Sequence, residues 1–225
     1  MPSAGRRPAW VFSTRADGDL AIEAPAVETA RAALLARADG PEASCNWLVQ
    51  VHGADVAVAG APGEHRGTEA DALVTAVPGV PLAVQTADCG AIVLTSPEGV
   101  VGAVHAGWRG LAAGVVGAAV ASMRDLGATE VVAHAGPMIH PECYEFGEDD
   151  LAAVAEALGP GVRGRTAQGA PALDLPAAVA AAVAGAGASL ATPSPACPAC
   201  DEAHYFSHRA RRETARLAAV VWMDR

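Results

Sequence analysis

Residues 81–110 read PLAVQTADCGAIVLTSPEGVVGAVHAGWRG, and this stretch decides the fold. It contains two apolar segments with the character of β-strands, separated by Pro97, Glu98 and Gly99. Proline suits the first central position of a type I turn, and glycine suits the left-handed residue that follows it. The sequence therefore predicts a β-hairpin with a three-residue loop and a bulge at the glycine.

The length of this loop fixes which residues of the two strands face each other. A three-residue loop pairs Ser96 with Val100, and the same register places Ala91 opposite His105. Cys89 then lies on the same face as His105, one step away along the diagonal. Diagonal neighbours on one face are roughly 7–8 Å apart, so long side chains can meet there. A two-residue loop would put Cys89 and His105 on opposite faces, so the turn residues allow them to share a site.

Charge and cysteine content limit the possible partners and compartments. The 225-residue chain has 15 Lys and Arg against 25 Asp and Glu, a formal net charge of −10 at pH 7. This argues against nonspecific binding to nucleic acids or anionic membranes. The most apolar late segment, residues 176–191, is mostly alanine and too short to span a bilayer. Five cysteines without an export signal indicate a reducing, cytoplasmic compartment, with the thiols free or metal-bound.

Strands and helices are intermixed along the chain. Besides the hairpin, we expect strands at residues 9–14, 47–52, 56–58, 71–75 and 131–135, and helices at residues 27–38, 111–126, 149–158, 175–184 and 206–223. Strict alternation of strand and helix is missing, which favours mixed sheets with flanking helices, a mixed α+β fold, over a doubly wound parallel sheet. No change in composition marks a boundary, so we expect one domain over residues 1–225 and a monomer.

Three metal-competent residues lie at expected strand ends beside glycine: His52, Cys89 and His105. Glycine lets a backbone or a substrate approach closely. Two histidines and one cysteine are three protein ligands, which leave the fourth position of zinc open for water or substrate. Each residue taken alone is better explained as an ordinary buried side chain, so spacing by itself does not establish a site.

Several short blocks resemble the signature of one family. They are QVHG (50–53), DALVT (71–75), TADC (86–89), VHAGWRG (104–110), GP (136–137), ECYE (142–145), CPAC (197–200) and FSHR (206–209). In these blocks the chain resembles the laccase-domain or polyphenol-oxidase proteins of the YfiH type. The resemblance implies a single α/β/β/α domain and a zinc ion held by His52, Cys89 and His105. It also implies phosphorolysis of purine nucleosides, including methylthioadenosine, with adenosine deamination and weak phenol oxidation. Some members are linked to removing miscoded serine from a peptidoglycan precursor.

Three further residues are candidates for catalysis or substrate binding. Asp88 adjoins the cysteine, but neighbours on a strand face opposite ways, so we expect a backbone or arginine partner unless a kink turns it into an acid or base. Arg109 lies in the turn before a helix and could bind phosphate as a bidentate donor, or simply tighten the loop. Arg15, in a loop after the first strand, is a second candidate for the same anion.

The CPAC block suggests a second zinc site, with His204 and His208 following it. Only three residues separate Cys200 from His204, whereas a zinc finger needs roughly a dozen. A pair of packed thiols, Cys197 and Cys200, is the simpler interpretation, and Cys143 is interpreted as structural.

Four functions remain open at this point. The leading one is a zinc-dependent purine nucleoside phosphorylase with adenosine deaminase activity, acting on a purine nucleoside and phosphate. The second is a cysteine hydrolase with Cys89 as nucleophile and His105 as base, for example in peptidoglycan precursor editing. Copper-dependent phenol oxidation ranks lower, because seven histidines are too few for a multicopper oxidase and a single copper would only shuttle electrons. The fourth is a non-enzymatic protein that holds a metal.

Overall fold

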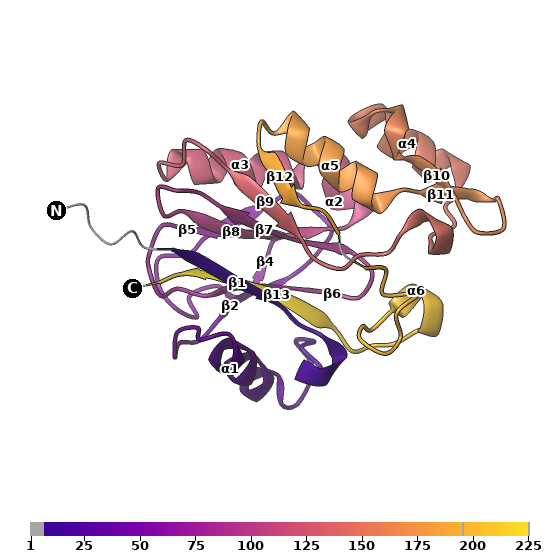
Figure 1. Ribbon diagram of the computed structural model, residues 1–225. Helices are drawn as coiled ribbons and strands as arrows, with labels where there is room; N and C mark the ends of the chain where they lie inside the picture. Colours follow the sequence, from indigo (N-terminus) through magenta and orange to yellow (C-terminus); the bar gives the residue numbers. More distant parts are fainter. Residues whose placement is uncertain (1–6, 195, 225) are drawn as a thin grey trace.

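Two β-sheets lie face to face at the centre of the molecule, and helices cover the outer face of each (Figure 1). The structure is a computed structural model that describes residues 7–194 and 196–224. The five-stranded sheet runs, in spatial order, β1 (Pro8–Phe12), β13 (Leu217–Met223), β6 (Leu82–Thr86), β2 (Asn46–Val49) and β4 (Arg66–Glu69). The six-stranded sheet runs β12 (Ser189–Thr192), β9 (Val132–Ala135), β7 (Gly90–Thr95), β8 (Val101–Ala106), β5 (Ala72–Thr75) and β3 (Val56–Val58). Both sheets contain parallel and antiparallel pairs.

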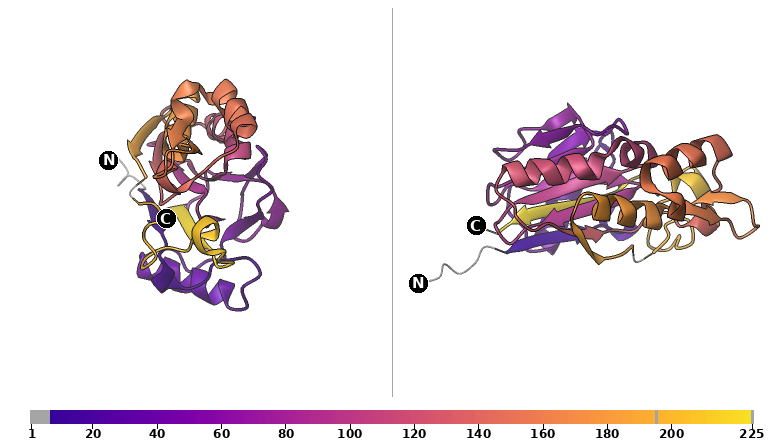
Figure 2. Two further views of the ribbon diagram at one scale, coloured as in Figure 1. Left: turned by 90° about the vertical axis from the view of Figure 1, so that its right-hand side faces the viewer. Right: turned by 90° about the horizontal axis from the view of Figure 1, so that it is seen from above.

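The helices complete four layers. Helix α1 (Val27–Arg37) packs on the outer face of the five-stranded sheet. The outer face of the six-stranded sheet is covered by α2 (Trp108–Ala113), α3 (Val115–Asp125) and α5 (Leu175–Gly185), and α4 (Glu148–Leu158) packs against α2 and α5 (Figure 2). The smaller elements are α6 (His208–Arg211), the hairpin β10 (Arg163–Arg165) with β11 (Pro171–Leu173), and the 3-10 turns η1 (Arg15–Asp17), η2 (Pro141–Cys143) and η3 (Pro160–Val162). The α/β/β/α layering and the mixed α+β class predicted from the sequence are confirmed.

Side chains alternate between the two faces of each central strand, so the strands fill the space between the sheets and also the space beneath the helices on either side. On β7, Ile92 and Leu94 face the helices, whereas Val93 faces the other sheet. On β13, Val221 faces the other sheet, and Trp222 packs against α1. Successive side chains of a strand point to opposite faces, so a strand covered on both sides must be apolar throughout.

The hairpin at the centre of the six-stranded sheet has the predicted register. Ala91 pairs with His105, and the Ser96 N–H donates to the Val100 carbonyl at 3.0 Å. Gly99 has φ +89°, the left-handed conformation that the turn requires. The prediction from the turn residues is therefore confirmed in loop length, turn glycine and pairing.

Two predicted helices differ from the structure. The helix expected over residues 111–126 begins earlier, at Trp108, and is divided at Gly114, which has φ +89°. The helix expected over residues 206–223 is wrong: α6 ends after one turn at Arg211, the next residue, Arg212, has φ +57°, and β13 begins at Leu217. The seven residues of β13 are buried on both faces between β1 and β6, so they lack the alternation that identifies a strand. No described helix is long and apolar enough to cross a membrane.

Candidate active site

The three predicted ligands meet where the chain passes from one sheet to the other. His52 follows β2, Cys89 lies between β6 and β7, and His105 belongs to β8. One donor atom of each lies within 4.8 Å of the other two, and Cys89 Sγ is 4.0 Å from His52 Nε2. The two imidazole rings stand nearly perpendicular, with centroids 4.8 Å apart. The structure thus brings together the three residues that the hairpin register and the resemblance selected.

A buried carboxylate holds two of these three residues. Asp71 is fully buried, and its Oδ1 lies 2.7 Å from His105 Nδ1. The same carboxylate accepts backbone N–H bonds from Val51 (3.1 Å), His52 (3.0 Å) and Gly53 (2.7 Å). Because Nδ1–H donates to the carboxylate, Nε2 is the nitrogen of His105 that would bind a metal ion, once it has lost its proton. His52 adopts φ +61° to complete this arrangement.

Sequence reasoning missed Asp71, although a signal was present. Asp71 heads the DALVT block and directly precedes β5, whose four residues are all buried. An aspartate next to a fully buried strand must be paired, because an unpaired buried carboxylate is very costly. The sequence did not reveal that its partners would be His105 and the loop that carries His52.

Two glycines of the HAGWRG block are required by close packing around the cluster. A Cβ atom added to Gly107 would lie 2.7 Å from His52 Cδ2 and 3.4 Å from Cys89 Sγ. A Cβ atom on Gly110 would lie 2.9 Å from the Gly53 carbonyl oxygen. Separations under 3.0 Å force atoms to move, so any side chain here would displace the loop that carries His52.

The neighbours of the cluster control its charge. Burial alone would raise the pKa of Cys89, but hydrogen bonds and charge from His105 and His52 outweigh it and lower the pKa to about 6. Burial alone would lower the pKa of His105, whereas Asp71 and Cys89 raise it to about 9. At neutral pH without metal, the pair is therefore a thiolate beside an imidazolium. The thiolate is the form of cysteine that binds metals and attacks electrophiles.

The donor set fits a metal ion. Two imidazole nitrogens and one thiolate suit zinc with an open fourth position, and they also suit a single copper ion. His52, Cys89 and His105 could therefore hold a metal, and the Asp71–His105 bond is the support that histidine ligands of metals usually have.

The cluster opens onto a cavity of about 460 Å³, a size suited to a small organic molecule. Its other polar lining residues are Glu23, Gln50, Gln85, Thr86, His208 and Arg216. Gln50 is held rigid, because its side chain donates to the Gln85 carbonyl (2.7 Å) and accepts from the Gln85 N–H (2.8 Å). Arg216 Nη1 donates to the backbone carbonyls of residues 213–215, which fixes this guanidinium at the cavity wall.

The structure places Asp88 and Arg109 outside the lining of this cavity. Asp88 has φ +91°, and its carboxylate accepts from Ser207 Oγ and from the Arg209 N–H, both at 2.6 Å. Arg109 is exposed and lies over the ring of Trp108, with its guanidinium carbon 4.2 Å from the ring centroid. A catalytic role for Asp88 and phosphate binding by Arg109 stay predictions.

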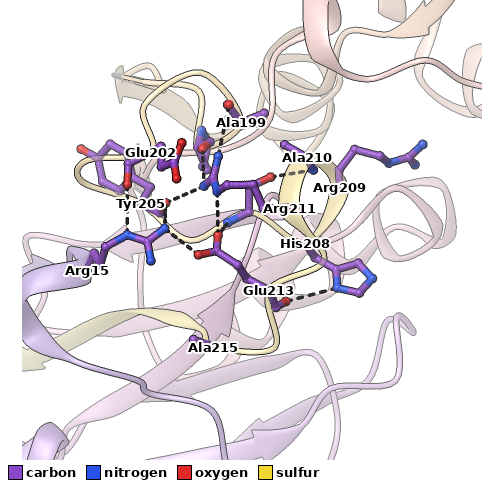
Figure 3. A network of polar contacts seen from close by, with 12 residues as sticks. Arg15, Ala199, Glu202, Tyr205, His208, Arg209, Ala210, Arg211, Glu213 and Ala215 are labelled. Carbon is purple, nitrogen blue, oxygen red and sulfur yellow. Dashed lines mark hydrogen bonds and ion pairs between the residues drawn. The ribbon is translucent and has the colours of Figure 1, made fainter.

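Arg15 belongs to a network of polar contacts in the C-terminal segment (Figure 3). Its guanidinium donates to the carbonyls of Glu202 and Tyr205 and forms a 2.7 Å ion pair with Glu213. It also lies over the Phe206 ring, with its guanidinium carbon 4.3 Å from the centroid. These contacts engage both Nε and Nη2 of Arg15. The arginine that lines the cavity is instead Arg216, and His208 lies there as well. Phosphate binding by Arg15 also stays a prediction.

The second group of thiols is larger than expected. Cys143 joins Cys197 and Cys200, and the three sulfurs lie within 4.8 Å of one another. His204 and His208 do not take part: His204 Nδ1 binds Asp201 at 2.8 Å, and His208 lines the cavity. Cys143 is 57 residues away from Cys200 in the sequence, so spacing could not reveal this contact.

A model of the family described as multi-copper polyphenol oxidoreductase laccase matches residues 17–224. The chain belongs to this family. Within it, the chain is 45% identical over 205 residues to a Streptomyces coelicolor protein named purine nucleoside phosphorylase, covering 89% of this chain and 84% of that protein.

Two solved structures share the fold. A Neisseria meningitidis protein superposes with a TM-score of 0.84 at 26% identity and covers 98% of this chain and 100% of its own. YlmD from Geobacillus stearothermophilus gives a TM-score of 0.79 at 28% identity and covers 100% of this chain and 94% of its own. The family resemblance drawn from the sequence blocks is confirmed. The names of its phosphorylase relatives support the view that this protein is an enzyme.

Proposed function

We propose that this protein is a purine nucleoside phosphorylase that acts on adenosine, inosine and methylthioadenosine, with adenosine deamination as a second activity. The observation that carries the proposal is the His52, Cys89 and His105 cluster, which opens onto a nucleoside-sized cavity with Arg216 on its wall. The name of the Streptomyces coelicolor relative supports the substrate class. From its cysteine content we propose a cytoplasmic location, and from its charge the absence of nucleic-acid and membrane partners. We also propose that the protein is a monomer.

Phosphorolysis makes two demands on the cavity. A phosphate oxygen forms a bond to C1′ of the ribose while the bond from C1′ to the purine nitrogen breaks, and the purine leaves with a proton. The attacking anion needs positive charge directed at it, and the leaving base needs a proton donor. Arg216 and His208 are the basic side chains that the C-terminal segment brings to the cavity wall. We assign phosphate binding to this pair.

We propose zinc as the metal at His52, Cys89 and His105, where a bound ion would supply Lewis acidity and activate water. Asp71 keeps His105 in the tautomer and orientation that the site requires. Gln50 adds a rigid polar wall, because its side-chain amide is bonded to both the carbonyl and the N–H of Gln85. Deamination would use the same cavity, with water in place of phosphate as the nucleophile and ammonia leaving from C6.

A cysteine hydrolase is the second candidate, and one observation favours it. The pKa of Cys89 is lowered to about 6 and that of the adjacent His105 is raised to about 9, which suits a thiolate nucleophile beside the imidazolium that has taken its proton. The two proposals differ in their need for metal. Full activity in metal-stripped protein, with a covalent intermediate on Cys89, would favour the hydrolase.

The test is release of hypoxanthine from inosine, measured with and without phosphate. We expect Arg216→Ala to raise KM for phosphate about tenfold or more, since a charge-assisted contact is lost, with KM for inosine changed far less. Arg109→Ala is the matched control and should leave both constants nearly unchanged. The reverse result would return the phosphate site to Arg109. Failure to release a base from any purine nucleoside would contradict the phosphorylase.

A further inference from the structure

The sulfurs of Cys143, Cys197 and Cys200 come from two segments that are distant in the sequence. Cys143 ends η2, in the loop that follows β9, whereas Cys197 and Cys200 enclose the CPAC turn ahead of α6. The Sγ atoms of Cys143 and Cys200 lie 3.1 Å apart, and the third sulfur is within 4.8 Å of both. Cys197 is buried, Cys143 is half-buried and Cys200 is exposed. The cluster therefore lies at the surface, apart from the cavity, whose lining includes none of the three.

Burial raises the pKa of Cys197, but the backbone brings an amide donor to its sulfur. The His140 N–H donates to Cys197 Sγ at 3.4 Å. The carbonyl of Cys197 accepts from the N–H groups of Cys200 (3.1 Å) and Asp201 (3.0 Å), which closes the turn. Amide donors directed at a sulfur favour its charged form over the neutral thiol. A pair of packed thiols would gain little from such an arrangement.

A positive charge lies beside the same turn. Arg211 donates to the carbonyls of Pro198 (3.1 Å) and Ala199 (3.3 Å), the two residues between the cysteines. Arg211 shares the Glu213 carboxylate with Arg15, so one positive charge of the pair stays unneutralised by Glu213. Three thiolates and one divalent cation carry a net charge of −1, which this positive charge would offset.

We propose that Cys143, Cys197 and Cys200 form a second metal site, which binds a thiophilic divalent cation such as zinc. Thiolates are the ligands that zinc prefers in structural sites, and a CxxC turn with a distant third cysteine is a common way to supply them. Binding releases the three thiol protons, and the exposed side of Cys200 leaves the fourth position to water. The ion would tie the loop after β9 to the C-terminal segment.

This tie bears on the cavity through the network shown in Figure 3. Arg211 connects the CPAC turn to Glu213 through a 2.9 Å ion pair. Glu213 accepts from the Ser207 N–H at 2.8 Å, and Ser207 Oγ donates to Asp88, the neighbour of Cys89. His208 follows Ser207 directly and lines the cavity. The second ion would therefore hold in place the segment that presents His208 and Arg216.

The experiment uses the Cys89→Ala protein, so that the first cluster no longer contributes three ligands. After incubation with zinc and dialysis, we expect one zinc per chain by elemental analysis. With cobalt, we expect the sulfur-to-metal charge-transfer absorption of several thiolates. Zinc should also raise Tm, because it binds the folded chain, in which the three thiols are clustered, more tightly than the unfolded chain. Adding Cys197→Ser or Cys200→Ser should remove all three signals. Cys45→Ser, which changes a buried cysteine outside both clusters, is the matched control and should keep them.

Two results would overturn the proposal. One is a Cys89→Ala protein that binds no zinc while its three clustered thiols react freely with a thiol reagent. The other is a disulfide between two of the three cysteines in the metal-free protein as isolated, which would make the cluster a redox pair. Because Cys200 is exposed, Cys200→Ser is expected to fold even if Cys197→Ser does not. None of these measurements depends on nucleoside turnover, so the outcome is independent of the proposed phosphorylase activity.

Discussion

The two sulfur-containing clusters differ in what surrounds each cysteine. Cys89 has two imidazoles as neighbours and, behind one of them, the carboxylate of Asp71. Cys143 has two further thiols. The pKa of Cys89 is accordingly lowered to about 6, whereas burial and the neighbouring sulfurs raise the pKa of Cys143. Two half-buried cysteines thus differ in charge at neutral pH because their neighbours differ.

This difference separates reactivity from structure. The first cluster is ionised before any metal arrives and opens onto a cavity, so it can engage a substrate as well as an ion. The second becomes charged only when a cation displaces its protons, and it lies beside a turn that organises the C-terminal segment. The first cluster is therefore expected to control turnover, and the second to control stability.

The largest expected effect is a difference in enzyme activity between variants of the first and the second cluster. Cys89→Ala should lower kcat/KM for inosine phosphorolysis more than about 100-fold, since even the residues that support metal ligands cost 10–100-fold when changed. Cys200→Ser should change kcat by less than about threefold at 25 °C, because its sulfur lies outside the cavity. Steady-state kinetics on both variants, with Tm measured alongside, checks this. Comparable loss of turnover in both would remove the distinction between the clusters.

The second effect concerns Asp71, the positioning residue that only the first cluster has. Asp71→Asn turns an amide donor toward the backbone N–H groups that the carboxylate accepts from, and it weakens the hold on His105 Nδ1. We expect metal affinity at the first cluster to fall roughly 10–100-fold. Competition with a chelator measures the affinity, and the pH dependence of turnover should shift with it.

Asp88→Asn is the control for this experiment, because that carboxylate faces Ser207 and the Arg209 N–H. It should keep metal affinity nearly unchanged while loosening the C-terminal segment. If Asp71→Asn and Asp88→Asn lower metal affinity equally, the support of the first cluster is not specific to Asp71. If Asp88→Asn instead abolishes turnover in folded, metal-loaded protein, Asp88 is the acid or base considered from the sequence.

The sequence predicted what depends on local chemistry and missed what depends on distant contacts. The turn at residues 97–99 fixed the register of the hairpin, and with it the shared face of Cys89 and His105. The strand β13 was missed because it is apolar on both faces and follows a run of arginines and alanines typical of helices. Pairing with β1 and β6, residues more than 100 positions away, overrides that preference.

Distant contacts also decided which parts of the two clusters and the cavity the sequence could not predict. The association of Cys143 with the CPAC turn requires the folded loop after β9, and no spacing rule describes it. Arg216 reaches the cavity because β13 begins immediately after it, so a misassigned helix hid its position. Arg109 and Arg15 were selected for their local setting beside a turn, and the structure places neither in the cavity lining.

A third, smaller effect tests the difference in charge state directly. In metal-stripped protein at pH 7, iodoacetamide should alkylate Cys89 first, since the thiolate is the reactive form and a pKa of about 6 leaves it mostly ionised. Its rate should fall as pH drops through about 6. Cys143, with its raised pKa, should react appreciably only in alkaline solution. Peptide mass mapping locates the label, and Cys89→Ala should abolish the fast phase. Equal rates would mean that the imidazoles do not stabilise the thiolate.

The smallest effect concerns Glu213, which links the second cluster to the cavity. Burial would raise the pKa of Glu213, but the Ser207 N–H and the guanidiniums of Arg15 and Arg211 lower it. A carboxylate with a lowered pKa in the folded state stabilises the fold above its ordinary pKa, and this contribution is lost as pH falls through the lowered value. Glu213→Gln should therefore reduce the free energy of unfolding at pH 7 by about 1–2 kcal/mol, a modest value because these ion pairs are partly exposed. Urea unfolding at pH 7 and at pH 3.5 measures it, and the gap between variant and wild type should shrink at the lower pH. A pH-independent gap would show that packing, and not the charge of Glu213, connects the second cluster to the cavity.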